Sequence, residues 1–186
     1  MKTPGGTLLT RLFGLDGRVA IVTGASSGLG EALAVGLAAA AGARVGLAAR
    51  RVERLDALAE RIDGLAVGCD LLGESSVSQL VGRVAERLGP PEILINAAGA
   101  LNGVHRAETE PVQAIRATMA AGLFRSEMTD EMYTNERTAE WLRKNTLLPD
   151  AADSQDFVGA ALWLTSDAGR YVTGQTIIVD GGWTAR

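Results

Sequence analysis

Apolar residues follow two alternating patterns along this chain, short continuous runs and longer stripes at helical spacing. The runs predict buried strands, because a parallel sheet covered on both faces leaves its strands without a polar side. These strands are expected at residues 19–22, 45–48, 66–69, 93–95 and 177–179. The stripes predict helices at residues 32–41, 52–62, 77–88 and 156–164. This alternation predicts an α/β fold, a doubly wound parallel sheet in a single domain over residues 1–186.

A glycine-rich stretch, residues 23–30 (TGASSGLG), separates the first expected strand from the first expected helix. Gly24 allows a tight turn, while Gly28 and Gly30 lack a Cβ and let the backbone approach a pyrophosphate closely. The first-turn amides and the dipole of the helix would then face the phosphates. An ordinary glycine-rich turn is the alternative, but the strand–turn–helix context favours dinucleotide binding.

The composition fits one compact domain and argues against several classes of function. The chain is 47% hydrophobic and 4% aromatic, which suits an aliphatic α/β core. Its net charge of −4 argues against a nucleic-acid partner. Cys69 is the single cysteine, so no intrachain disulfide forms. Without an apolar run of about 18 residues or a signal-like N-terminus, we expect no membrane partner and a cytoplasmic location.

Residues that could bind a metal ion are scarce. His105 is the only histidine, and it has no motif partner, so a solvated loop residue is the simpler interpretation than a catalytic base. No cluster of His and Cys indicates a metal site. The three tryptophans, Trp141, Trp163 and Trp183, are interpreted as packing residues.

The spacing Thr-Gly-x-x-x-Gly-x-Gly in the glycine-rich stretch resembles that of the short-chain dehydrogenase/reductase family. Three further stretches agree in the same order: Cys69-Asp70-Leu71, residues 96–99 (NAAG) and residues 171–182. Together they cover residues 12–183 with one gap. The resemblance implies a Rossmann-type fold and an oxidoreductase that moves a hydride between NAD(P)(H) and a small-molecule secondary alcohol or ketone.

The resemblance also implies roles for individual residues. Asp70 and Leu71 would flank the adenine, Asn96 would hold backbone near the ribose, and Ser126 would lie near the nicotinamide amide. Ser26 and Ser27 would contact ribose or phosphate, with helix N-capping as the competing interpretation. The alternatives are a cap for Asp70 and a plain turn for Asn96. The implied cofactor-binding residues are Gly24, Ser26, Ser27, Gly28, Leu29, Gly30, Arg50, Arg51, Asp70, Leu71, Asn96, Ala97, Gly99 and Ser126.

The end of the second expected strand bears on the choice of cofactor. Ala49 stands where an NAD-preferring member would carry an Asp, so no carboxylate is expected there to repel a 2′-phosphate. Arg50 and Arg51 could bind that phosphate through charge-assisted hydrogen bonds, although both could instead be solvated residues at a helix start. The sequence therefore favours NADP(H) over NAD(H). Position 27, where a basic residue would be a second marker of NADP binding, holds Ser27.

The family's catalytic segment is absent from the chain. Its Tyr-x-x-x-Lys pair, in which the phenol is the general acid/base, occurs nowhere: Tyr133 is followed four residues later by Arg137, and Tyr171 by Gln175. No catalytic residue is therefore assigned. The sequence passes directly from a helix-like stretch that ends at Met119 to a glycine loop at Gly122. Compared with a domain length near 250, about 70 residues are missing.

Two explanations of this discontinuity between residues 119 and 122 remain open. Either a normal dehydrogenase has lost an internal segment from the sequence, or the polypeptide is this short. An intact mass near 19.4 kDa would exclude the first. A catalytically silent dinucleotide-binding or interaction domain is accordingly the alternative function. We also expect a homo-oligomer that pairs through residues 156–164 and 176–179, the family's C-terminal helix and strand.

Overall fold

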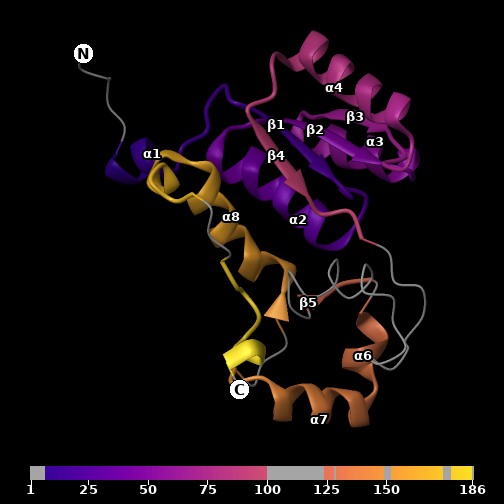
Figure 1. The fold of residues 1–186 in the computed structure, drawn as a ribbon, viewed down its shortest axis with the longest axis vertical. Coiled ribbons are helices and arrows are strands. Elements are labelled where there is room, and N and C mark those ends of the chain that lie inside the picture. The colour runs from indigo at the N-terminus through magenta and orange to yellow at the C-terminus, as the bar shows by residue number, and fades with distance from the viewer. Residues whose placement is uncertain (1–6, 100–123, 128, 149–151, 174–176, 186) are drawn as a thin grey trace.

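The computed structural model describes residues 7–99, 124–127, 129–148, 152–173 and 177–185 (Figure 1). Residues 15–99 form what we call the sheet lobe, and residues 124–185 what we call the C-terminal region. The short helix α1 precedes the lobe, whose strands and helices then alternate. In order, these elements are α1 (Leu8–Phe13), β1 (Val19–Thr23), α2 (Gly28–Val35), β2 (Arg44–Ala49), α3 (Val52–Ile62), β3 (Leu65–Gly68), α4 (Glu74–Leu88) and β4 (Ile93–Asn96).

The four strands form a parallel sheet in the order β3-β2-β1-β4. The chain moves outward from β1 to β3 and then returns to the other side of β1, where Thr23 pairs in register with Asn96. The fold class is therefore confirmed, as are the first four expected strands, with the third shifted by one residue to Leu65–Gly68. A nucleotide site in such a sheet is expected where the strand order reverses, outside the carboxyl ends of β1 and β4.

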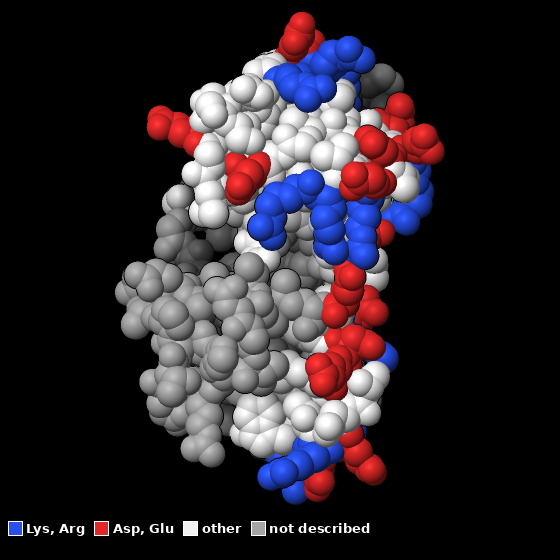
Figure 2. Space-filling view, turned by 90° about the vertical axis from the view of Figure 1, so that its right-hand side faces the viewer, with Lys and Arg blue, Asp and Glu red and all other residues white. Residues whose placement is uncertain are grey.

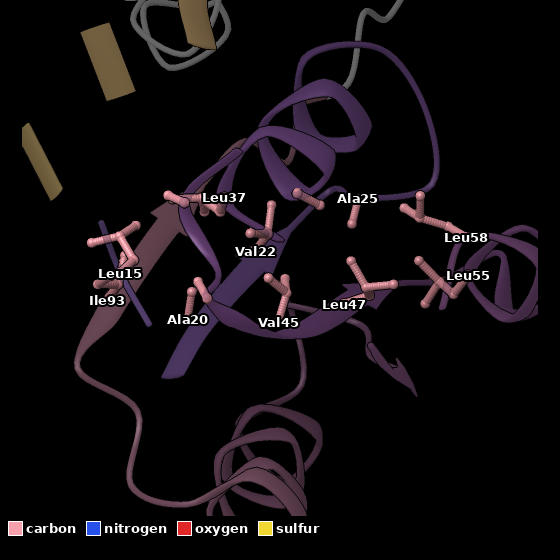
Figure 3. Close-up of a cluster of buried hydrophobic side chains, with 13 residues drawn as sticks. Leu15, Ala20, Val22, Ala25, Leu37, Val45, Leu47, Leu55, Leu58 and Ile93 are labelled. Carbon is pink, nitrogen blue, oxygen red and sulfur yellow. The ribbon is translucent and has the colours of Figure 1, made fainter. Parts of the chain in front are cut away.

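Helices cover both faces of the sheet, which makes it doubly wound. On one face, a core cluster joins β1 and β2 to α2 and α3, and Figure 3 shows Val22 and Leu47 pointing to the same side of the sheet. On the other face, α4 packs through Leu80 and Val84 against Ile21 and Val67. Because both faces are covered, β1 is buried at all five positions, which explains its continuous apolar sequence.

The C-terminal region is built from short elements around the far end of the molecule from α4 (Figure 1). Its strands β5 and β6 pair in parallel, and Phe124 meets Phe157 edge to face at 5.5 Å between ring centroids. Trp141 and Trp183 likewise pack edge to face at 5.0 Å. Its elements are β5 (Phe124–Arg125), α6 (Asp130–Thr134), α7 (Glu136–Asn145), β6 (Ala152–Asp153), a 3-10 turn (Ser154–Phe157), α8 (Val158–Thr165), and two further 3-10 turns (Asp167–Gly169 and Trp183–Ala185).

Helix α8 connects the two parts of the chain. It lies beside α2 (Figure 1), and a Cβ on Gly36 would collide with the Val158 side chain. Leu162 of the same helix packs against the core cluster of α2 and α3. In addition, the Arg18 guanidinium donates to the Thr165 carbonyl at 2.9 Å. The helix expected at residues 156–164 is therefore present, beginning as a 3-10 turn.

Two sequence predictions need correction. The predicted strand at residues 177–179 is wrong, because these residues have no strand partner within the described chain and lead into a turn that binds residues 147 and 148 through the Gly181 carbonyl. The strand half of the predicted pairing surface is therefore not formed. The helix expected at residues 32–41 starts earlier, at Gly28, and continues as a π-helix over Gly36–Ala40.

Within the described residues, no helix is long and apolar enough to cross a membrane.

Candidate dinucleotide site

The glycine-rich stretch of residues 23–30, which we call the glycine turn, meets the loop after β4 at the carboxyl edge of the sheet. Gly24 has a φ of +68°, and a Cβ there would lie 2.6 Å from the carbonyl oxygen of Ala97. A Cβ on Gly30 would collide with the Gly24 carbonyl. Close backbone approach therefore requires glycine at both positions, and Gly24 also has a left-handed conformation. The Thr23 hydroxyl donates toward Asn96 Oδ1 and the Ile95 carbonyl, each at 3.4 Å, and joins the ends of β1 and β4.

The N-terminus of α2 has no side-chain cap. Ser27 is the N-cap residue, but its hydroxyl does not bond the helix amides. It accepts instead from an Arg51 terminal nitrogen at 2.7 Å. The capping alternative for Ser27 is therefore not realised, and no side chain among the described residues caps the first turn of α2. Such an end is suited to a phosphate, since amides and helix dipole both favour an anion.

The two adjacent arginines after β2 have different surroundings. Arg51 bonds both turn serines, reaching Ser26 Oγ at 3.0 and 3.2 Å and Ser27 Oγ at 2.7 Å. Arg50 is exposed, and it has no hydrogen bond or ion pair among the described residues. Arg51 is thus held at the glycine turn, while Arg50 extends from the same edge with its donors open.

A carboxylate from the C-terminal region reaches these arginines. Glu127 pairs with Arg51 at 3.4 Å and accepts from Arg54 at 2.5 and 3.0 Å. Figure 2 shows basic side chains gathered at mid-height of the molecule, directly above acidic ones. The hydrogen bond from Arg54 lowers the pKa of Glu127, and Glu127 in turn raises the pKa of Arg54. The end of β2 itself carries Ala49, as the sequence shows, but Glu127 brings a carboxylate to the adjoining arginines from a distant part of the chain.

Sequence reasoning missed Arg54 and Glu127. The first had a usable signal, because Arg51 and Arg54 are three residues apart and thus share one helix face. The second adjoins Ser126, which the resemblance already assigned to the cofactor. The contact itself joins positions 76 and 73 residues apart, so no local pattern could predict it.

Ser126 lies against the glycine turn. A Cβ on Gly28 would be 3.1 Å from Ser126 Cβ, and the Ser126 amide donates to Thr129 Oγ1 at 3.0 Å. The C-terminal region therefore covers the turn at Ser126 and Glu127. The nicotinamide contact proposed for Ser126 stays a prediction.

Asp70 and Leu71 follow β3, the strand beside β2, further along the carboxyl edge of the sheet. Asp70 Oδ1 accepts from the Leu72 amide at 3.1 Å, while Gly73 is the N-cap residue of α4, and the Asp70 carboxylate remains exposed. Leu71 is 43% exposed, which leaves an apolar surface for a flat ring. Both features are compatible with an adenine contact, which stays a prediction, as do the roles of Leu29, Asn96, Ala97 and Gly99.

Neither tyrosine is part of a Tyr-x-x-x-Lys pair, and the surroundings of the two differ. Burial raises the pKa of Tyr133 above its ordinary value of 10, with Arg125 partly opposing the shift. A phenol that loses its proton less readily is poorly suited to acid–base work near neutral pH. Tyr171 is 98% exposed, and Lys144 forms an i,i+4 ion pair with Glu140 at 2.7 Å. His105 and residues 119–122 lie outside the described residues. Among the residues that the structure describes, no group of three potential metal ligands occurs.

Comparison with known proteins identifies this architecture. The short chain dehydrogenase family matches residues 18–133, and the enoyl-(acyl carrier protein) reductase family matches residues 109–184. The chain belongs to the short-chain dehydrogenase/reductase family. It is 28% identical to gluconate 5-dehydrogenase of Gluconobacter oxydans, with 93% of this chain and 97% of that protein covered. It is 40% identical to farnesol dehydrogenase of Aedes aegypti over 54% of this chain and 43% of that protein.

Solved structures of short-chain dehydrogenases show the same fold. A member from Mycobacterium marinum superposes with a TM-score of 0.82 at 22% identity, covering 96% of this chain and all of that chain. A protein from Beutenbergia cavernae that has been proposed to be an NAD(P)-dependent gluconate 5-dehydrogenase, solved with NADP at low occupancy, gives a TM-score of 0.78 at 23% identity, covering 94% of this chain and 99% of that chain.

Family membership establishes the class of activity. The relatives are dehydrogenases and reductases, and this chain is by the same resemblance an NAD(P)-dependent oxidoreductase of alcohols and ketones. The alignment to gluconate 5-dehydrogenase extends over 249 positions against 186 residues here, so at least 63 aligned positions have no counterpart in this chain. That difference is close to the shortfall of about 70 residues expected from the motif order.

Proposed function

We propose that this short-chain dehydrogenase/reductase binds NADP(H) in preference to NAD(H) and reduces or oxidises a polyhydroxylated small molecule. The observation that supports NADP(H) is the group of three arginines, Arg50, Arg51 and Arg54, at the carboxyl end of β2. Among the described residues they outnumber the two carboxylates that act on them, Glu127, which pairs with Arg51 and Arg54, and Glu31, whose charge also acts on Arg54. A 2′-phosphate carries close to two negative charges and is favoured by such an excess of guanidinium groups.

The substrate class is proposed from the relatives. Gluconate 5-dehydrogenase, D-threitol dehydrogenase and 2-dehydro-3-deoxy-D-gluconate 5-dehydrogenase act, by their names, on sugar acids or polyols. A secondary alcohol or ketone of that class is the first substrate to test, with farnesol as an apolar comparison.

The residues of this chain would hold and orient the dinucleotide. The α2 amides would hold the pyrophosphate, and the backbone at Gly24 and Ala97 would admit the cofactor at the sheet edge. The bound nicotinamide supplies the hydride chemistry. A proton carrier of the Tyr-x-x-x-Lys kind is absent from the sequence, so we place that function in the segment missing between residues 119 and 122.

A catalytically silent dinucleotide-binding domain is the second candidate. It is favoured by the absence of any Tyr-x-x-x-Lys in the 186 residues and by the raised pKa of Tyr133. In that case the protein would bind the cofactor and transfer no hydride.

One experiment separates the two functions. The intact mass is measured first, then NADPH and NADH binding by fluorescence, then turnover with gluconate, threitol and farnesol. We expect a chain verified at 19.4 kDa to bind NADPH without turnover, and a longer product of the gene to turn over. Turnover by the 186-residue chain would contradict the placement of the proton carrier in the missing segment. Failure to bind either cofactor would contradict both candidates.

The arginines are tested by replacement. R50Q combined with R51Q should weaken NADPH binding more than NADH binding, because contacts to the 2′-phosphate are lost with NADPH only, whereas loss of the Arg51 bonds to Ser26 and Ser27 affects both cofactors alike. A charge-assisted hydrogen bond contributes about 1.5–3 kcal/mol, so the NADPH Kd should rise at least tenfold. An equal loss for both cofactors would show that the arginines do not contact the phosphate.

A further inference from the structure

Glu127 has a place in the site that neither the family resemblance nor the relatives assign. Three segments far apart in sequence converge here: the glycine turn with Ser26 and Ser27, the start of α3 with Arg51 and Arg54, and the loop after β5 with Glu127. Ion pairing brings the carboxylate to the same guanidinium groups that would receive a 2′-phosphate.

The donors of Arg51 are largely occupied in this arrangement. Its Nε and one terminal nitrogen bond the two serines, and its other terminal nitrogen faces Glu127 at 3.4 Å. Arg54 presents both terminal nitrogens to the same carboxylate, a bidentate geometry of the kind that guanidinium forms with carboxylate and phosphate alike. A phosphate that binds Arg51 or Arg54 must therefore displace Glu127 or lie against its negative charge.

The same carboxylate affects NAD(H) differently. Ribose hydroxyls are neutral and can donate to a carboxylate, the contact that an acidic residue provides in NAD-binding members of this fold. At the end of β2 that position holds Ala49, and the structure supplies a carboxylate to the adjoining arginines from residue 127 instead. Glu127 thus opposes the cofactor with the phosphate and tolerates the cofactor without it.

We infer that Glu127 is a specificity-determining residue, an internal anion that competes with the 2′-phosphate for Arg51 and Arg54 and so limits the preference for NADP(H). This inference rests on the proposed cofactor site but assigns it a new residue with a defined direction of effect. Arg50, which has no partner among the described residues, is left as the arginine available to the phosphate without competition.

The test is E127Q, which removes the charge and keeps the size of the side chain. NADPH and NADH Kd values are measured by fluorescence titration on the full chain at low salt. An exposed ion pair is weak, but a phosphate carries nearly two charges, so we expect NADPH to bind about three- to tenfold more tightly. NADH binding should change by less than about twofold. E127A should change NADPH binding in the same direction.

The matched control is D130N. Asp130 lies three residues further along, is about equally exposed, and pairs with Arg125 at 3.0 Å, away from Arg51 and Arg54. The same loss of charge there should leave the ratio of the two Kd values unchanged. An equal effect of D130N and E127Q would show that overall charge is responsible and would overturn the inference.

The remaining outcomes separate the inference from the proposed function. If wild type binds NADPH and E127Q leaves the ratio unchanged or weakens NADPH binding, the inference fails and the proposed function stands. Weaker binding would mean that Glu127 holds the arginines in place for the phosphate. If no variant binds either dinucleotide, the proposed function fails and the inference with it. Matching far-UV circular dichroism of the variants shows that each has folded.

Discussion

The sheet lobe and the C-terminal region differ in how they are held together. Among the described residues, nearly every buried hydrophobic side chain lies in the sheet lobe, and only Phe124, Leu142 and Ala161 lie in the C-terminal region. The lobe therefore has a core of its own on each face of its sheet. The C-terminal region relies on short polar contacts and on α8 packing against α2. The candidate dinucleotide edge belongs to the sheet lobe, and the ionic contact over it joins Arg51 and Arg54 of the lobe to Glu127 of the C-terminal region.

Removing a core side chain from each region is the most severe test of this comparison. Leu47 is fully buried in β2, and L47A should lower the free energy of unfolding by about 2–5 kcal/mol because it leaves a cavity that cannot collapse. Leu142 of α7 is 6% exposed but is the only buried side chain of its helix. L142A should cost about half as much. Urea denaturation measures both, and equal losses would contradict the comparison.

The close approach of the glycine turn to the loop after β4 gives a second test. G24A places a Cβ against the Ala97 backbone in a left-handed conformation and should cost about 2–4 kcal/mol. Gly17 is the matched control, because its φ is +79° but nothing lies within 4 Å of its added Cβ. G17A should therefore cost about 1 kcal/mol. If the two variants unfold at the same urea concentration, backbone contact at Gly24 contributes nothing.

A helix cap sharpens the description of the C-terminal region. Asn135 Oδ1 accepts from the Arg137 and Thr138 amides at the start of α7, so N135A should cost that helix about 1 kcal/mol. Hydrogen exchange at these two amides should accelerate, while exchange in β1 should not change. N145A, at the other end of the same helix, removes a single side-chain bond to the Trp141 carbonyl and should have a smaller effect. Faster exchange in β1 would mean that the two regions unfold together.

Acid should loosen the C-terminal region. Hydrogen bonds lower the pKa values of three carboxyl groups. The donors are Arg54 for Glu127, Lys144 for Glu140 and Thr184 for Asp180. A lowered folded pKa stabilises the protein above the ordinary values of 4.5 for Glu and 3.8 for Asp. This contribution is lost as the pH falls through the lowered values. Limited proteolysis at decreasing pH should cut the C-terminal region below about pH 4.

The variant T184V should bring the cutting near Asp180 to higher pH, because it removes the largest cause of that lowered pKa. Cleavage that is independent of pH between 7 and 3 would contradict the prediction.

The fold of the sheet lobe could be predicted from sequence because its determinants are local. Four apolar runs gave four strands, and the sharp reversal at Gly24 and the stripe of α4 followed from turn chemistry and helical period. The strand at residues 177–179 could not be decided in this way. A strand forms only beside another strand, and the partner is a property of the whole sheet.

The candidate site divides along the same line. Positive φ values at Gly24 and Gly28, and the Gly24 carbonyl beside Gly30, are local features that agree with the motif. The contacts of Gly24 with Ala97 and of Gly28 with Ser126 come from distant parts of the chain. The different surroundings of Arg50 and Arg51 are invisible in an Arg-Arg dipeptide, because they depend on Ser26, Ser27 and Glu127. The sequence predicts where the candidate phosphate-binding edge lies, whereas the distribution of charge over that edge is a tertiary property.

The contact between Trp141 and Trp183 gives this protein an intrinsic optical reporter. Two indoles 5.0 Å apart at 65° couple their electronic transitions, which produces a paired circular-dichroism band that separated indoles do not give. One ring belongs to α7 and the other to the final turn, Trp183–Ala185. Loss of that signal would therefore record detachment of the chain end from α7 in real time, without a label.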